Sequence, residues 1–267
     1  MTASVTRSFK LTIAYDGTGF SGWQVQPNQP TIQGYLQNAL QRLTGDRIQV
    51  VGSGRTDAGV HAHAQVASCS FAWRDSPQHL LRAMNTHLPE SIVVHAAEEA
   101  CQGFHAIRDA IGKRYRYQLK IGGIRDAFDF RYHWHLHGDL DFEKMRLAAQ
   151  RLIGEHDFKS FQATGADRKT TVRNVRACDL IVPEVNHDHA CHLLIEVEVD
   201  RFLYNMVRNI VGTLVEVGRG KQTVEWIDQV LVACNRDAAG PTAPACGLFL
   251  LRVDYPDSVL KSQYRER

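Results

Sequence analysis

The segment best suited to chemistry is a glycine-rich stretch from Gly52 to Ala62, which holds one carboxylate, Asp57, and one arginine, Arg55. Glycine has no Cβ, so a loop of this kind lets the backbone approach a ligand closely. The stretch lacks the Lys-Ser/Thr pair of a phosphate-binding Walker loop. Two interpretations remain open: a tight turn in which Asp57 makes an Asx-type hydrogen bond, or an exposed loop in which Asp57 is a catalytic carboxylate.

A second candidate is Arg208, a cation on the apolar side of a predicted helix. The apolar stripe that passes this position consists of Tyr204, Val207, Val211 and Leu214. A guanidinium beside or within a buried face needs an anion, because burying it alone costs several kcal/mol. The partner could be any acidic side chain in a structural ion pair, or a group in a functional site.

A third candidate is the stretch from Lys113 to Tyr117, where Tyr115 and Tyr117 alternate with Arg114 and Arg116. On a strand, the tyrosines would share one face and the arginines the other. Aromatic rings flanked by arginines suit an unstacked base and its phosphates. An ordinary amphipathic strand with aromatic core residues has the same pattern. A basic run in residues 160–176 is likewise either a phosphate-contacting loop or a solvated surface.

Alternating histidines raise the question of a metal site. They form two groups: His61 and His63, and His133, His135 and His137. Neither group has an acid or a cysteine at ligand spacing, so we expect no metal there and prefer a wet sheet surface or RNA contacts. A Gly-x-Ser-x-Gly elbow is absent, which disfavours a hydrolase of that type.

The elements that must position these residues fall into two groups. Hydrophobic periodicity in the first predicts strands at 9–15, 48–51, 65–71 and 92–96, a helix at 32–43 and a helix opening at Ser76-Pro77. Thr31 stands as the N-cap of the first helix, and Gly45 lies just past its end. The resulting order is βαββαβ, that of ferredoxin-like and RNA-recognition-type sheets.

The second group begins with a strand from Lys113 to Ile121. A helix from Phe142 to Leu152, capped by Asp141, follows, and the remaining elements are strands at 175–182, 193–199 and 248–253 and helices at 204–217 and 223–234. We place the boundary between the groups in the segment from His105 to Gly112. The prediction is two α/β domains, residues 1–108 and 109–267.

Composition indicates a globular protein. The chain has 267 residues, 44% hydrophobic and 22% charged, which excludes a mainly disordered protein. No apolar run is long enough to span a membrane, and the first residues lack the apolar core of a secretory signal, so we expect a cytoplasmic protein. The formal net charge of +2 does not by itself indicate nucleic-acid binding, which would need local clusters of basic residues.

Taken together, the motifs resemble those of the tRNA pseudouridine synthase A family over nearly the whole chain. The segments that carry the resemblance are residues 14–24 (AYDGTGFSGWQ), 54–62 (GRTDAGVHA), 113–117 (KRYRY), 202–212 (FLYNMVRNIVG) and 239–245 (AGPTAPA). The resemblance implies an isomerase that converts uridine to pseudouridine at tRNA positions 38, 39 and 40, in the anticodon stem-loop. It also implies an α+β fold of two ferredoxin-like domains with mainly antiparallel sheets, a basic cleft between them, a homodimer and no cofactor.

The resemblance also implies roles for individual residues. Asp57 matches the family's catalytic aspartate, and Arg208 the arginine that pairs with it. Tyr115 matches the tyrosine that stacks on the everted base, while Arg55 would help to extrude the nucleotide or hold its phosphate. Whether Asp57 attacks C1′, removes the C2′ proton or adds to C6 stays open. The rival functions are a non-catalytic RNA-binding module and, more weakly, a metal-dependent hydrolase.

Overall fold

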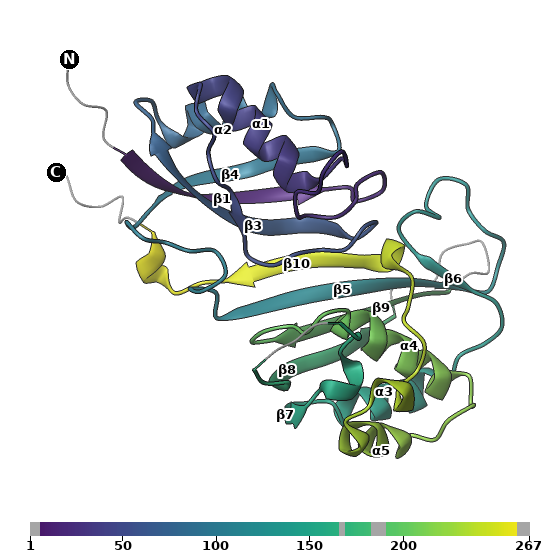
Figure 1. Ribbon diagram of the computed structural model, residues 1–267. Coiled ribbons are helices and arrows are strands. Elements are labelled where there is room, and N and C mark those ends of the chain that lie inside the picture. The colour runs from purple at the N-terminus through teal and green to yellow at the C-terminus, as the bar shows by residue number, and fades with distance from the viewer. Residues whose placement is uncertain (1–5, 166–168, 183–190, 261–267) are drawn as a thin grey trace. The chain divides into compact units, whose positions relative to one another are not determined.

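The computed structural model describes residues 6–165, 169–182 and 191–260 (Figure 1). Within it, the described parts of Met1–Ile111 and Leu250–Arg267 form one compact unit, and those of Gly112–Phe249 form a second. Both units combine helices with a mostly antiparallel sheet, which confirms the mixed α/β class at this coarse level. No helix among the described residues is long and apolar enough to cross a membrane.

The first unit has the predicted βαββαβ order. Its elements are β1 (Thr6–Tyr15), α1 (Ile32–Thr44), β2 (Val51–Gly52), β3 (His61–Ala72), α2 (Pro77–Asn85) and β4 (Ile92–Ala100). β1 is the central strand and runs antiparallel to both β3 and β4, while β2 pairs with β3. β10 (Leu248–Asp254), most of which belongs to this unit, lies next to β3. Figure 1 shows α1 and α2 side by side over the sheet.

Local sequence explains these elements. Phe9, Leu11 and Ile13 alternate along β1 and are completely buried, as a strand with one face in the core requires. α1 ends at Gly45, whose left-handed backbone lets its N–H donate to the Gln41 carbonyl. Thr31 occupies the N-cap position of α1, but its side chain makes no capping hydrogen bond.

The strand predicted at 48–51 is wrong in its bounds, because β2 begins only at Val51. The reason is that a side-chain hydrogen bond takes the place of main-chain hydrogen bonds to a neighbouring strand. The carbonyl of Val50 accepts a hydrogen bond of 2.7 Å from the buried amide side chain of Gln33. Sequence periodicity does not reveal such a contact.

The second unit is built on four antiparallel strands in the order β5 (Gly112–Ile121), β9 (Cys191–Val199), β8 (Val172–Ile181) and β7 (Gly154–Asp157). The short strand β6 (Trp134–Leu136) pairs parallel to β5. Its helices are α3 (Phe142–Gln150), α4 (Met206–Gly218) and α5 (Trp226–Ala233). Asp141 caps α3 as predicted, accepting a hydrogen bond of 3.0 Å from the Lys144 N–H.

Two helix starts in this unit were predicted too early. The helix expected from Tyr204 begins at Met206, because Asn205 before it has a left-handed backbone with φ of 58°. The helix expected from Thr223 begins at Trp226. β7, with the sequence GEHD, was missed because it has neither alternation nor β-branched residues.

Candidate active site

Asp57 lies in an ordered turn at the surface of the first unit. Its main-chain carbonyl accepts a hydrogen bond of 3.1 Å from the Val60 N–H, and Gly59 supplies the positive φ, 77°, inside the turn. Asp57 itself is half-buried, and Arg55 is exposed. The backbone from Asp57 to Val60 is therefore a tight turn closed by main-chain atoms, and Arg55 lies two residues before its carboxylate.

Thr56, directly before Asp57, is fixed through both its side chain and its main chain. Its hydroxyl lies 2.8 Å from the phenol oxygen of Tyr15, and its carbonyl accepts a hydrogen bond of 3.0 Å from the Trp23 N–H. Burial raises the pKa of Tyr15 to about 12, so the phenol remains protonated at neutral pH. Thr56 thus connects the Asp57 turn to the end of the central strand β1.

A buried glutamine holds the other end of the loop. Gln65 on β3 donates to the Gly54 carbonyl over 3.0 Å and accepts a hydrogen bond of 2.7 Å from the Ser53 hydroxyl. Because both donor and acceptor functions of its amide are used inside the protein, Gln65 can be completely buried. Neither Gln65 nor Ser53 was singled out from sequence, since amide and hydroxyl side chains show no periodic signal.

The glycines of residues 14–24 lie against the same turn. A Cβ on Gly17 would stand 2.0 Å from the Val60 carbonyl oxygen, and one on Gly22 would stand 2.6 Å from the Thr56 carbonyl oxygen. Two motifs separated in sequence are therefore one packed structure around Asp57. The glycines are required by this close backbone approach.

Replacing Gly22 with alanine is expected to destabilise the protein by about 2 to 5 kcal/mol, the sum of left-handed backbone strain and overpacking. It should also reduce activity, because the added methyl group pushes on Thr56 and Asp57. Gly45→Ala is the matched control: its φ of 82° is close to the 86° of Gly22, but no atom lies within 4 Å of the new methyl. Thermal unfolding and initial rates of both variants check this, and equal losses would contradict it.

In the second unit, Tyr115 lies on β5 and is buried, with 8% of its surface exposed. Its ring packs edge-on against Phe202, at 4.9 Å between centroids and 81° between planes. Tyr117 is completely buried and donates to the Pro244 carbonyl over 2.7 Å, so it is a core residue. On the same strand, burial lowers the pKa of Lys113 to about 8, with the Arg201 charge adding to the effect.

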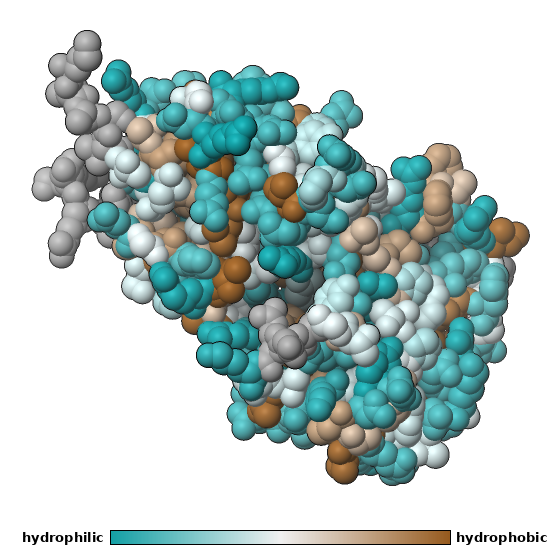
Figure 2. All heavy atoms as spheres, viewed as in Figure 1, coloured by the Kyte–Doolittle hydropathy of each residue, from teal (hydrophilic) through white to brown (hydrophobic). Residues whose placement is uncertain are grey.

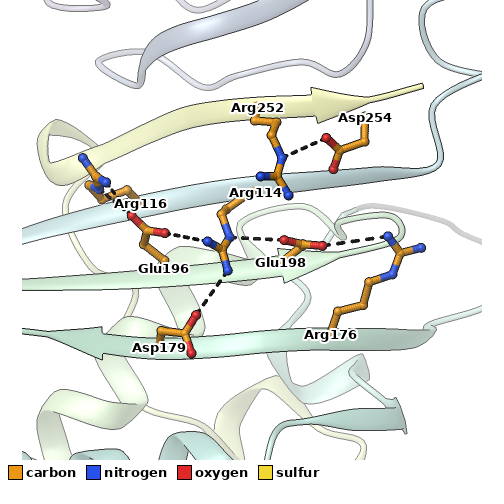
Figure 3. A network of polar contacts seen from close by, with 8 residues as sticks. All are labelled: Arg114, Arg116, Arg176, Asp179, Glu196, Glu198, Arg252 and Asp254. Carbon is orange, nitrogen blue, oxygen red and sulfur yellow. Dashed lines mark hydrogen bonds and ion pairs between the residues drawn. The ribbon is translucent and has the colours of Figure 1, made fainter. Parts of the chain in front are cut away.

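Arg114 and Arg116, which alternate with these tyrosines, are bound by acids, as in the amphipathic strand that the sequence pattern equally allows. Arg114 pairs with Asp179, Glu196 and Glu198 at 3.1 to 3.2 Å, and Arg116 donates from its Nε to Glu196 over 2.8 Å (Figure 3). Glu196 is itself buried. The face of β5 opposite the tyrosines therefore carries an internally neutralised network across β5, β9 and β8.

Arg208 is the third residue of α4, and its guanidinium is oriented by main-chain and amide oxygens. Its Nε donates to the Ala243 carbonyl over 2.7 Å, and Nη1 donates to Oδ1 of Asn205 over 3.2 Å. The Arg208 carbonyl in turn accepts a hydrogen bond of 3.1 Å from the Ala243 N–H. Segment 239–245 thus fixes both the backbone and the side chain of Arg208.

The same segment is held to α4 by a buried asparagine that was missed from sequence. Asn209 donates to the Phe161 carbonyl over 2.8 Å and accepts from the hydroxyl of Thr242 over 2.6 Å. A Cβ on Gly212 would stand 1.7 Å from the Pro241 carbonyl oxygen. The signal was present in the motifs, since a polar residue and a glycine interrupt an otherwise apolar helix.

The remaining candidates are less informative. In the basic run, Phe161 is completely buried, Arg173 is nearly so, and Asp167 and Arg168 lie outside the described residues. His61 is buried, and its Nδ1 lies 3.0 Å from the Gly17 amide nitrogen. Within the described ranges, no group of three or more histidine, cysteine or acidic side chains is placed to hold a metal ion.

Comparison with known proteins shows which family has both groups of residues. Residues 11–107 and 148–256 match the family model described as tRNA pseudouridine synthase. The chain belongs to this family. The resemblance inferred from the motifs is thereby confirmed. Asp57 and Arg55 lie in the first segment of this chain that matches the family model, residues 11–107. Arg208 lies in the second, residues 148–256, and Tyr115 lies between the two segments.

Individual relatives agree with the family match. A tRNA pseudouridine synthase A of Brevibacillus brevis is 44% identical over 249 residues, which cover 93% of this chain and 100% of the relative. One of Blochmanniella pennsylvanica is 43% identical over 246 residues, covering 92% of each. Among solved structures, an archaeal box H/ACA Nop10-Cbf5 complex aligns with a TM-score of 0.36 at 13% identity, over 78% of this chain and 42% of that one.

The structure assigns the four candidate residues to two groups. Arg55 and Asp57 lie in one loop of the first unit, and Tyr115 and Arg208 belong to the second. The pairing of Asp57 with Arg208 stays a prediction.

Proposed function

We propose that the chain isomerises uridine to pseudouridine at positions 38, 39 and 40 in the anticodon stem-loop of tRNA. The observation that carries the proposal is the similarity to proteins named tRNA pseudouridine synthase A over at least 92% of this chain. The ordered turn that presents Asp57, with Arg55 beside it, supports the same reaction. The protein acts without cofactor or metal, in the cytoplasm, as a homodimer.

The reaction needs one reactive carboxylate and a pocket that retains the free base. Uracil is detached from the ribose at N1, rotates, and is joined again through C5. The C5 hydrogen leaves as a proton, and N1 takes up a proton. Asp57 attacks C1′, removes the C2′ proton or adds to C6, and in each version the carboxylate must be ionised. The contacts of Thr56 and Gly22 fix the backbone that carries it.

The second unit supplies the other groups of the proposed site. The two units act as domains with a basic cleft between them, where the Arg208 guanidinium pairs with Asp57 and favours its ionised form. The Tyr115 ring, supported by Phe202, stacks on the everted base. Arg55 is exposed and makes no hydrogen bond or ion pair with the described residues, which leaves it available for a phosphate.

The direct test is release of tritium from tRNA transcript labelled at uracil C5. The wild-type protein should release tritium in the presence of EDTA, because no metal takes part. Tight tRNA binding without release would instead identify a non-catalytic RNA-binding module, and activity lost in EDTA would identify a metal-dependent enzyme.

Arg208→Gln should move the acid limb of the pH–rate profile to higher pH. An opposite charge at ion-pair distance lowers a carboxyl pKa by about 1 to 3 units, so its removal lets Asp57 protonate at correspondingly higher pH. Single-turnover rates between pH 4 and 8 measure the shift, with Arg219→Gln at the exposed end of α4 as control. If Arg208→Gln lowers the rate at every pH without shifting the acid limb of the pH–rate profile, Arg208 has only a structural role.

A further inference from the structure

The segment between β5 and β6, residues 122–133, exposes more apolar surface than a solvated loop needs. We call it the β5–β6 loop. Phe128 is 92% exposed and Ile124 is 89% exposed, and the ring of Phe130 is partly exposed beside them. Figure 1 shows the loop extending away from the strands of this unit, and Figure 2 shows hydrophobic residues at the surface in the same part of the view. Clustered exposure of this kind marks a binding surface.

The charged residues of the loop include two exposed arginines that lie near the ring of Phe130. Arg125 and Arg131 are both exposed, and their guanidinium carbons lie 5.8 and 5.5 Å from the Phe130 ring centroid. The loop also holds two aspartates, both half-buried: Asp126 accepts a hydrogen bond of 2.7 Å from the Phe128 N–H, and Oδ2 of Asp129 lies 3.7 Å from Nδ1 of His133. The loop therefore presents exposed aromatic rings with guanidinium groups beside one of them.

The base of the loop is ordered and is joined to the segment that orients Arg208. Cys246 donates from its Sγ to the His133 carbonyl over 3.4 Å. Three residues earlier in the chain, the Ala243 carbonyl accepts the hydrogen bond from Arg208. Within the second unit, the β5–β6 loop and the Arg208 side chain thus both contact residues 243–246.

We infer that the β5–β6 loop binds the tRNA substrate, with Phe128 stacked on an unpaired base and Arg125 at a phosphate. This rests on the proposed function and adds a contact to it. Exposed rings beside guanidinium groups are the combination that binds single-stranded nucleic acid, because every base has a face to stack on and every nucleotide has a phosphate.

Filter binding of an unmodified tRNA transcript at several salt concentrations tests the inference. Phe128→Ser should raise the Kd about 5- to 150-fold, the loss expected for one stacked base, without changing the salt dependence. Arg125→Ser should reduce the slope of log affinity against log salt by about 0.7 to 0.9. Val232→Ser removes an equally exposed apolar side chain, 84% exposed on α5, and should change neither quantity.

Three outcomes are separable, because the exposed positions can be changed without disturbing the core. If Phe128→Ser binds tRNA as tightly as Val232→Ser, the inference is wrong. If Phe128→Ser lowers the mass in sedimentation, the loop is a contact between protein copies. Failure of the wild-type protein to form pseudouridine would overturn the proposed function. This outcome is measured as product formed, so it is independent of the tRNA affinities that test the loop.

Discussion

Asp57→Asn is expected to lower the single-turnover rate of tritium release by about a thousandfold or more, which corresponds to about 4 kcal/mol of activation free energy. Asparagine has nearly the same shape but cannot act as an anionic nucleophile or base. The substitution leaves in place the Asp57 carbonyl and the hydroxyl and carbonyl of Thr56, whose hydrogen bonds hold the turn. Binding of tRNA should therefore persist while chemistry stops.

The control for Asp57 is Asp46→Asn, which removes an exposed carboxylate from the same unit just after α1. The Asp46 carbonyl accepts a hydrogen bond of 3.3 Å from the Thr44 hydroxyl, and the Asp46 N–H donates one of 3.1 Å to the same hydroxyl. This variant should release tritium at the wild-type rate. Substantial activity in Asp57→Asn would assign the carboxylate role to another residue.

Tyr115→Leu is expected to reduce kcat/KM about 5- to 150-fold, the range for loss of one aromatic stacking partner, while Tyr115→Phe should keep most of the activity. Affinity for tRNA should fall less than turnover, because phosphate contacts remain. Since Tyr115 is buried against Phe202, the leucine variant will also lose some stability.

Stability and function can be separated with Phe158→Leu, which replaces another buried aromatic side chain of the second unit, packed against Phe161. It should lower the unfolding temperature with little effect on kcat/KM. If Tyr115→Leu and Phe158→Leu lose activity only in proportion to their lost stability, Tyr115 is a core residue and not a stacking platform.

Sequence reasoning was most successful where a pattern is long and local. The alternation Phe9, Leu11, Ile13 and the helical spacing of Ile32, Leu36 and Leu40 each bury one face, so these elements and their order were predictable. The bounds of β2 were wrong because a side-chain hydrogen bond from Gln33 replaces strand pairing at Val50. β7 was missed because it is too short and polar to show a period.

Contacts between residues far apart in the sequence could not be predicted from the sequence pattern. Nothing near Arg114 in the sequence indicates that Glu196 and Glu198 on β9 neutralise it, and nothing near Leu250 indicates that the chain returns to the first unit. Single residues were identified by their unusual surroundings, such as an arginine on the apolar helix α4. Their roles came from the resemblance to a family, since periodicity carries no information about which distant segments meet.

The measurement that tests the central claim most directly is base-resolution mapping of pseudouridine in an unmodified tRNA transcript incubated with the purified protein. We predict pseudouridine at positions 38, 39 or 40 wherever the transcript carries uridine there, and none after incubation with Asp57→Asn. Pseudouridine confined to other positions, or formed equally by the Asp57 variant, would contradict the account.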